Sequence, residues 1–258
     1  MARIIAVANQ KGGVGKTTTA INVAAALAAA GRNVLAIDID PQGNMTSGLG
    51  VDKENVRYSV YDLLIGDCDA EECITGTVSQ CLDLIPANVN LAGAEVELLD
   101  AARREYLLKD KLASVAGRYD YVIIDCPPAL SMLTINALTT AKGVLVPIQC
   151  EFYALEGLAQ LLYTINLVRD RLNKSLKIQG VVFTMYDSRT NLSADVVENV
   201  RTNLNQHIYR TVIPRNVRLA EAPSHGLPIN LYDPRSTGAE SYRRLAEEII
   251  AEEKKGGR

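Results

Sequence analysis

The feature that most limits how this chain can fold is a glycine-rich stretch near its start, NQKGGVGKTT at residues 9–18. An apolar run at residues 4–8 precedes it, and an Ala-rich stretch with helical character follows it. Strand, glycine loop and helix in that order are the context of a phosphate-binding loop. The glycines let several backbone N–H groups converge on one anion, and the helix N-terminus adds a partial positive charge.

Two side chains of this loop have predicted roles, and a third departs from the usual pattern. We expect Lys16 to reach the β- and γ-phosphates and the Thr17 hydroxyl to coordinate Mg²⁺. Gln10 stands where the pattern has a glycine, and Lys11 follows it. A solvated loop lysine is the simple alternative for Lys11. The functional hypothesis is that its ammonium meets the phosphates of a nucleotide on a neighbouring subunit, as an arginine finger does in trans.

The rest of the chain predicts an α/β protein. Its 258 residues are 48% hydrophobic and 22% charged, enough for a sizeable core in one open sheet. Strand-like runs at residues 4–8, 34–40, 82–86, 121–125, 143–148, 177–185 and 209–214 alternate with helical patterns. The predicted helices are residues 17–30, 130–140, 154–172, 193–206 and 237–253, with one or two more in 92–115.

This alternation predicts a single doubly wound, mostly parallel sheet flanked by helices, in one domain that spans residues 1–258. Residues 254–258 are expected to be a frayed tail. Residues 45–78 are turn-rich, with a short amphipathic piece at 61–64, and support no assignment of chemistry.

Carboxylates end two of the predicted strands. Asp38 and Asp40 close residues 34–40, and Asp125 closes residues 121–125. Ligands bind outside the carboxyl ends of parallel strands, so Asp125 is expected near Mg²⁺, through water. The carboxylates of Asp38 and Asp40 could simply end their strand. We favour Asp40 for orienting the attacking water, because the following residues, 41–43, place it at the mouth of the loop.

Charge is unevenly distributed along the chain. The net charge is −3, but residues 171–218 hold eight basic and three acidic residues, a local +5 that leaves −8 for the rest. A solvated surface and a polyanion-binding surface are both consistent with such a window.

The five cysteines are irregularly spaced and form no CxxC pair, which argues against a disulfide framework and against zinc. They are expected to be buried or incidental thiols. The sequence shows no signal-peptide pattern and no apolar run of about 20 residues, so a soluble, cytoplasmic protein is expected.

The motifs together resemble those of a known family. Residues 11–18, KGGVGKTT, resemble the deviant Walker A motif of the ParA/MinD superfamily of P-loop ATPases. Residues 37–44, IDIDPQGN, resemble its A′ motif, and residues 123–128, IIDCPP, its Walker B motif. Residues 149–157 and 212–226 are similar to the chromosomal ParA branch, called Soj in spore-forming bacteria. The resemblance extends from Ile4 to the closing helix.

This resemblance implies an ATPase with ATP and Mg²⁺ as cofactors, slow and stimulated by a partner. It assigns catalytic roles to Lys11, Lys16 and Asp40. The nucleotide-binding residues that it implies are Lys11, Gly12, Gly13, Val14, Gly15, Lys16, Thr17 and Thr18, with Met185, Pro214 and Asn216 around the adenine. The implied metal residues are Thr17 and, through water, Asp125.

The resemblance also implies partners. ATP would close two subunits into a homodimer that binds double-stranded DNA without sequence preference through Arg189 and Arg218. Doubling a modest basic patch gives ATP a physical means to switch on phosphate binding, which favours the polyanion interpretation of residues 171–218. A ParB/Spo0J-type protein would stimulate hydrolysis, and the ATPase would be nucleoid-associated and serve chromosome or plasmid partition.

Differences from other members of this superfamily argue against some of their functions. No helix-turn-helix precedes the loop, so operator binding is not expected. Residues 245–253, LAEEIIAEE, are acidic and do not resemble the basic membrane anchor of MinD, so no stable membrane anchor is expected. A MinD-like membrane-associated positioning ATPase is the alternative. A third possibility is a tyrosine kinase on a related scaffold, but the tyrosines of this chain are dispersed rather than clustered. The cysteines do not fit a nitrogenase iron protein, which needs two positioned thiolates per subunit.

Overall fold

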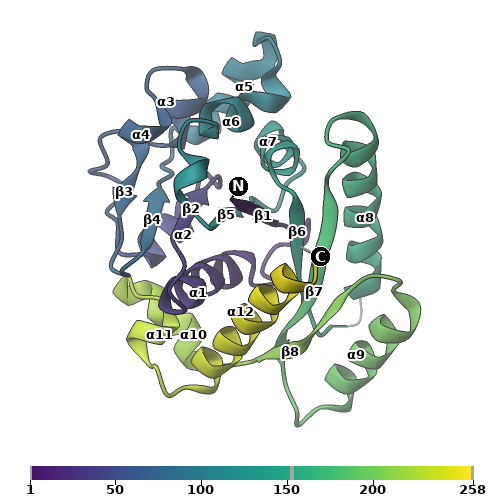
Figure 1. Ribbon diagram of the computed structural model, residues 1–258. Helices are drawn as coiled ribbons and strands as arrows, with labels where there is room; N and C mark the ends of the chain where they lie inside the picture. Colours follow the sequence, from purple (N-terminus) through teal and green to yellow (C-terminus); the bar gives the residue numbers. More distant parts are fainter. Residues whose placement is uncertain (1, 152–153, 257–258) are drawn as a thin grey trace.

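The computed structural model describes residues 2–151 and 154–256, and its centre is an eight-stranded sheet (Figure 1). The strand order is β3-β4-β2-β5-β1-β6-β7-β8. All neighbouring strands are parallel except β3 and β4. The strands are β1 (Arg3–Val7), β2 (Val34–Asp38), β3 (Thr75–Gly76), β4 (Leu82–Ile85), β5 (Tyr121–Asp125), β6 (Gly143–Gln149), β7 (Lys177–Tyr186) and β8 (Ile208–Pro214). The predicted mostly parallel sheet is confirmed.

Helices cover both faces of this sheet, as a doubly wound fold requires. The α-helices are α1 (Lys16–Ala29), α2 (Asn44–Gly48), α3 (Val60–Ile65), α4 (Ala70–Cys73), α5 (Leu91–Glu97), α6 (Leu107–Leu112), α7 (Met132–Thr140), α8 (Ala154–Arg171), α9 (Asn191–Asn203), α10 (Val217–Glu221), α11 (Ile229–Tyr232) and α12 (Thr237–Gly256). Helices α1 and α12 share one core with one side of the sheet, and α3 and α5–α8 share the other. No helix within the described ranges is both long and apolar enough to cross a membrane.

The central strands are apolar because both of their sides are buried. In β5, Tyr121 and Ile123 join the core under α1, while Val122 and Ile124 join the opposite core. Side chains alternate along a strand, so a strand covered on both sides needs an unbroken apolar run. Asp125 ends that run, and its register with Val7 of β1 and Asp38 of β2 brings three strand ends to one edge. This carboxyl edge carries the site.

The sequence-based prediction was incomplete between residues 45 and 115. That region contains α2, α3, α4 and the two-residue strand β3, none of which was assigned beyond a short amphipathic piece. The one or two helices expected at residues 92–115 are α5 and α6, with 3₁₀ turns between and after them. Short elements of four to seven residues are too brief to develop a clear apolar period.

The end of the chain also differs from the prediction. Helix α12 continues to Gly256, where a frayed tail was expected from residue 254. Residues 257–258 of that tail lie outside the described ranges, as do residues 152–153 of the stretch 149–157 that resembles the ParA branch.

Candidate nucleotide site

The glycine loop joins β1 to α1 and adopts the conformation that its sequence predicts. Gly15 is the N-cap of α1 with φ 83°, and Gly13 has φ 74°. Both lie in the left-handed region, where a side chain is strained and glycine is favoured. A Cβ on Gly12 or Gly13 would meet open space, so the loop backbone faces a cavity rather than packed atoms.

Side chains from the loop and its neighbours hold this backbone in place. The Asn9 amide donates to the Pro147 carbonyl at 2.7 Å, and its oxygen accepts from the Lys11 N–H at 3.0 Å. The Thr184 hydroxyl donates to the Val14 carbonyl at 2.8 Å. Gln10, which replaces the usual glycine, donates to the Thr164 hydroxyl of α8 at 3.0 Å. The replacement therefore ties the loop to α8.

A cavity of about 400 Å³ opens over the loop. Its lining is Gly12, Gly13, Gly15, Lys16, Thr17, Thr18, Asp40, Gln42, Asn44, Pro128 and Met185. The structure thus brings together the loop, the segment after β2 and the segment after β5. Lys16 is only 6% exposed, and its ammonium donates to the Lys11 carbonyl at 3.0 Å. Burial lowers the pKa of Lys16, and the charge of Asp125 opposes that shift. A buried cation in a glycine cradle suits a polyphosphate.

Asp125 suits a bound cation. Its carboxylate is fully buried, and neither oxygen has a hydrogen-bond partner among the described residues. Burial raises the pKa of Asp125 well above its usual range, and the neighbouring carboxylate of Asp38 adds to the shift. An unpartnered buried carboxylate is costly unless a positive charge compensates it. With the Thr17 hydroxyl lining the adjoining cavity, this arrangement fits Mg²⁺.

The two aspartates after β2 occupy different environments. Asp38 is buried and accepts from the Thr46 N–H at 2.8 Å and the Thr46 hydroxyl at 2.7 Å. Burial raises the pKa of Asp38 to about 6, although the bonds from Thr46 oppose the shift. Asp40 lines the cavity, is 8% exposed and accepts from the Gln42 N–H at 3.0 Å. Asp38 therefore holds the segment between β2 and α2 in place, and Asp40 faces the cavity.

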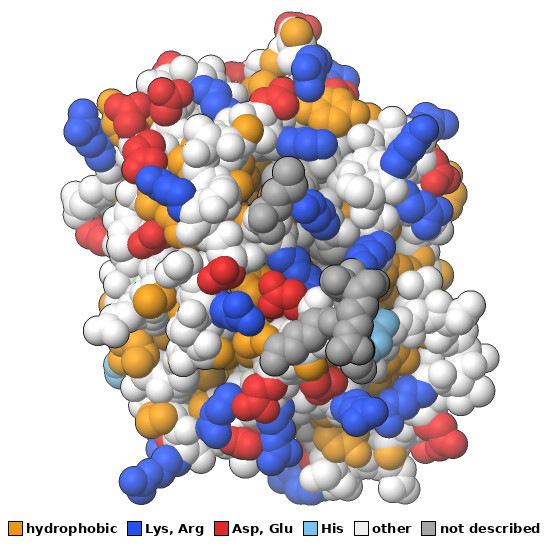
Figure 2. Space-filling view, in the orientation of Figure 1, with side chains coloured by type: hydrophobic (Ala, Val, Ile, Leu, Met, Phe, Trp, Pro, Cys, Tyr) orange, Lys and Arg blue, Asp and Glu red, His pale blue; other side chains and the backbone are white. Residues whose placement is uncertain are grey.

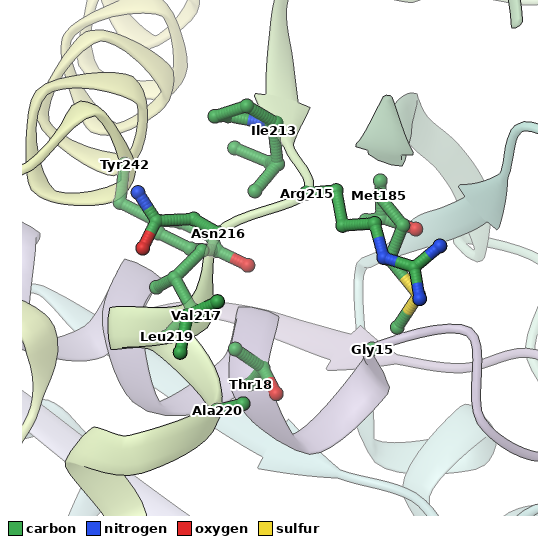
Figure 3. A pocket seen from close by; sticks show the side chains of 12 residues that line it. Gly15, Thr18, Met185, Ile213, Arg215, Asn216, Val217, Leu219, Ala220 and Tyr242 are labelled. Carbon is green, nitrogen blue, oxygen red and sulfur yellow. The ribbon is translucent and has the colours of Figure 1, made fainter. Parts of the chain in front are cut away.

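A second cavity of about 380 Å³ adjoins the first and has Gly15, Thr18 and Met185 in common with it. Its other lining residues are Thr184, Ile213, Pro214, Arg215, Asn216, Val217, Leu219, Ala220 and Tyr242. In Figure 3, Met185 and Arg215 form one wall, and Asn216 and Leu219 lie opposite them. Met185, Pro214 and Asn216, the three residues expected around the adenine, all line this second cavity.

Sequence reasoning missed several residues that shape these cavities. Arg215 and Tyr242 line the second cavity, and Asn9 and Thr184 brace the loop. Arg215 lies between Pro214 and Asn216, which were predicted, but the sequence indicates it only as one of the basic residues of 171–218. Nothing in the sequence joins Tyr242, far along the chain in α12, to the loop.

Three residues predicted for the nucleotide site line neither cavity: Val14 and Asp125, which are buried, and Lys11, which is partly exposed. The side chain of Lys11 is 36% exposed. Its ammonium pairs with the Glu151 carboxylate at 2.7 Å, at the end of β6. The positive charge of Lys11 therefore lies at the rim of the site.

The predicted DNA-contacting arginines are also at the carboxyl edge, Arg189 in the turn after β7 and Arg218 in the short helix α10 after β8. Arg189 is 83% exposed and pairs with Asp187 at 2.7 Å, with two guanidinium nitrogens on the two carboxylate oxygens. Arg218 pairs with Glu221 at 3.0 Å and with Asp233 at 3.6 Å. The other end of β7 lies at the opposite edge of the sheet, so the basic window of residues 171–218 does not form one patch.

Figure 2 shows the face in the orientation of Figure 1, where acidic and basic side chains are interspersed without a continuous basic field. Any attraction of this face for a polyanion therefore depends on local arginines rather than on net charge.

Known proteins resemble this chain over nearly all of its length. The family profile described as "AAA domain" matches residues 2–178. Sporulation initiation inhibitor protein Soj of Bacillus subtilis is 57% identical, over 97% of this chain and 99% of that protein. Chromosome partitioning protein ParA of Myxococcus xanthus is 52% identical, over 96% of this chain and 88% of that protein.

Solved structures agree on the fold. A structure titled cobyrinic acid a,c-diamide synthase from Mycobacterium smegmatis, with bound ADP and magnesium, has a TM-score of 0.88 and 43% identity, over 99% of this chain and 97% of that chain. The cell division ATPase MinD of Pyrococcus furiosus has a TM-score of 0.80 and 29% identity, over 97% and 99% of the two chains.

The parallel sheet, the glycine loop with a buried lysine, and the carboxylates at the strand ends define a P-loop ATPase that uses ATP and Mg²⁺. The chain belongs to the ParA/MinD family of these ATPases, within its Soj/ParA branch of chromosome-partitioning proteins.

Proposed function

We propose that this partition ATPase works as a switch: ATP joins two copies of the chain into a homodimer, and the dimer binds double-stranded DNA without sequence preference. A ParB/Spo0J-type partner stimulates an otherwise slow hydrolysis, which separates the subunits and releases the DNA. The protein then moves between a nucleoid-associated and a free cytoplasmic form, in the service of chromosome or plasmid partition. In this proposal, hydrolysis serves to change where the protein is located rather than to make a chemical product.

The position of Lys11 is the observation that carries this proposal. Lys16 is buried against the loop, whereas the ammonium of Lys11 lies at the rim, outside both cavities of its own subunit. A half-exposed ion pair contributes little, about 0–1 kcal/mol, so Glu151 holds Lys11 weakly. A second subunit across the rim would offer Lys11 a nucleotide's phosphates, with several negative charges in place of one.

Exposed apolar side chains at the same edge support a dimer. Val89, Leu130 and Val217 follow β4, β5 and β8 and are 76%, 49% and 72% exposed, and Met185 at the end of β7 is 36% exposed. Exposed apolar side chains at the edge that carries a ligand site favour burial against another surface. A second copy would bring the same residues to that surface, because a two-fold interface is self-complementary.

Each catalytic residue has a role that its surroundings support. Asp40 accepts from the Gln42 N–H and faces the cavity, where it would orient the attacking water toward the γ-phosphate. Lys16, and Lys11 of the other subunit, would stabilise the charge on the transferring phosphoryl group. When bound, Mg²⁺ neutralises charge on the phosphate oxygens.

DNA binding would depend on a few arginines in each subunit. Arg189, in the turn after β7, and Arg218, in α10, are exposed at the same edge as the nucleotide site. Phosphate contacts of this kind give affinity that is independent of sequence and falls with salt. The closed dimer would present two sets of arginines to one duplex, which is why ATP would control binding.

A MinD-like membrane-associated function is the alternative, and the described part of α12 does not favour it. The side chains of Tyr242, Leu245 and Ile249 in this helix are fully buried in the core that α1 and the sheet form. Its acidic residues Glu248 and Glu252 accept from groups of β7 and β8. A helix packed in this way offers little apolar surface to lipid.

Co-sedimentation separates the two functions. The protein is mixed with duplex DNA, and separately with anionic liposomes, each with ATP, with ADP and without nucleotide. We expect a pellet with DNA only when ATP is present, and none with liposomes. DNA binding that ignores the nucleotide would refute the switch, and ATP-dependent pelleting with liposomes would favour the alternative.

A further inference from the structure

Two cysteines in the region that the nucleotide site does not use lie unusually close together. Cys68 is in the turn between α3 and α4, and Cys73 is the last residue of α4. Their Sγ atoms are 2.7 Å apart, and both residues are buried, 5% and 2% exposed. This separation is only about 0.7 Å longer than a disulfide bond.

The surrounding structure holds both sulfurs in this position. Asp69, the N-cap of α4, donates its N–H to the Glu72 carboxylate at 3.0 Å, which closes the single turn between the two cysteines. The ammonium of Lys111 donates to the Cys68 carbonyl at 3.1 Å, and the Cys73 thiol donates to the Ser59 carbonyl at 3.6 Å. Each cysteine is therefore fixed from outside α4 as well as through it.

We propose that Cys68 and Cys73 form an oxidation site, in which a peroxide converts the two thiols into an intramolecular disulfide. This inference does not rest on the proposed function, because it concerns only the short loop between α3 and the end of α4.

The chemistry balances with one molecule of peroxide. The Cys68 thiolate attacks a peroxide oxygen, the O–O bond breaks, and Cys68 becomes a sulfenic acid while the leaving hydroxide takes up a proton to form water. The Cys73 sulfur then attacks the Cys68 sulfur, loses its proton and displaces the hydroxyl group as a second water. Two thiols and one peroxide give one disulfide and two waters.

The environment assigns the order of these steps. Burial raises the pKa of both thiols. At Cys68 the hydrogen bond with Cys73 opposes that shift, whereas at Cys73 the bond with Cys68 raises the pKa further. The Cys73 thiol also donates its proton to the Ser59 carbonyl at 3.6 Å, so Cys68 is assigned as the first nucleophile and Cys73 as the resolving thiol. The selectivity comes from proximity rather than from an activated thiolate, so the reaction is slower than that of an acidic thiol.

The other cysteines provide internal comparisons. Cys126 and Cys150 are buried in other parts of the fold, and Cys81 is exposed. Cys81 needs removal before the test, because no Lys or Arg separates it from Cys68 and Cys73, and trypsin would leave all three on one peptide. Cys81→Ser is a surface change and gives a background with four thiols.

The test exposes the folded Cys81→Ser protein to hydrogen peroxide and then labels its remaining thiols with N-ethylmaleimide in denaturant. Intact mass should show a fall from four labels to two, and dithiothreitol should restore all four. The tryptic peptide should lose two hydrogen atoms and resist backbone fragmentation between residues 68 and 73.

Cys68→Ser in the same background is the matched control. It should keep its three labelled thiols at peroxide levels that convert the parent, apart from slow over-oxidation that dithiothreitol does not reverse. Four remaining labels in the parent would overturn the proposal, as would an equal loss in the Cys68→Ser control. If a variant fails to fold, fragmentation mapping of the unsubstituted protein decides, and a disulfide that includes Cys81 in place of either partner would also refute the site.

Discussion

The phosphate cavity and the two exposed arginines lie at the same edge of the sheet, but they hold their charges differently. At the cavity, Lys16 and the neighbouring Asp125 are buried, and the backbone of the loop is fixed by hydrogen bonds. Beyond β7 and β8, Arg189 and Arg218 are largely exposed, and each is paired with a carboxylate of its own chain. The phosphate cavity is therefore preorganised for its ligand, whereas the exposed arginines are not.

This difference indicates how the two regions would depend on assembly. A buried, preorganised charge interacts strongly because water does not screen it. An exposed arginine in an ion pair contributes little by itself, and salt weakens it further. The nucleotide site can therefore bind its ligand within one subunit, whereas DNA binding needs several arginines together. Substitutions should then have large effects in the cavity and graded effects at the exposed arginines.

The largest effect is expected for Lys16→Ala. Removal of the buried ammonium eliminates the main cationic contact to the phosphates, so ATP affinity should fall about 1,000-fold. Titration with a fluorescent ATP analogue measures this change. Lys142→Ala, an exposed lysine before β6, is the matched control and should bind normally. If the Lys16 variant retained normal affinity, the cavity would not be organised around this residue.

Asp40→Ala should separate binding from hydrolysis. The variant should retain ATP, accumulate as a DNA-bound dimer and lose about 100-fold in turnover, because water loses its orienting carboxylate. Phosphate release and nucleotide binding are measured on the same preparation. Asp52→Ala, an exposed aspartate outside the cavity, should hydrolyse ATP at the parent rate. Normal turnover by the Asp40 variant would remove this residue from the mechanism.

Among the exposed arginines, Arg218→Glu should weaken DNA binding about tenfold at moderate salt, since each subunit loses a cation and gains a repulsive charge. ATP-driven dimerisation should remain intact. The control is Arg243→Glu on α12, whose exposed arginine pairs with Glu240 in a similar way. DNA titrations at several salt concentrations measure the effect, and unchanged binding of the Arg218 variant would contradict the assigned surface.

The smallest effect, and one of opposite sign, is expected for Asp187→Asn. The Asp187 carboxylate engages two nitrogens of Arg189, and that contact lowers the pKa of Asp187. Neutralising the carboxylate frees the guanidinium and removes a negative charge from the edge where we propose that DNA binds, so the affinity for DNA should rise about threefold. Asp195→Asn on α9 controls for charge alone. Weaker binding in the Asp187 variant would mean that the pair positions Arg189 for DNA rather than restraining it.

The same contrast separates what the sequence could predict from what it could not. The seven longer strands and the phosphate loop follow from local patterns: apolar runs, two of which end in aspartate, and glycines ahead of a Lys-Thr pair. Asp125 could be placed because the register of β1 and β5 puts strand ends at one edge. Asp40 could be preferred over Asp38 from the residues that follow it.

Features that depend on tertiary contacts could not be predicted. Tyr242 reaches the second cavity only because α12 packs against α1, and Asn9 braces the loop through a carbonyl of β6. The restraint of Arg189 by Asp187 depends on side-chain geometry within a turn that has no sequence period. The contact between Cys68 and Cys73 depends on the short helix α4, which was not predicted.

The central claim is that each nucleotide site is completed by Lys11 of a second subunit. Analytical ultracentrifugation of Asp40→Ala protein, which should hold ATP without hydrolysing it, tests this claim most directly. With ATP the account predicts a dimer, with ADP a monomer, and with ATP a monomer again when Lys11→Ala is added. A protein that dimerises equally with ATP and ADP, or that dimerises with ATP without Lys11, would contradict it.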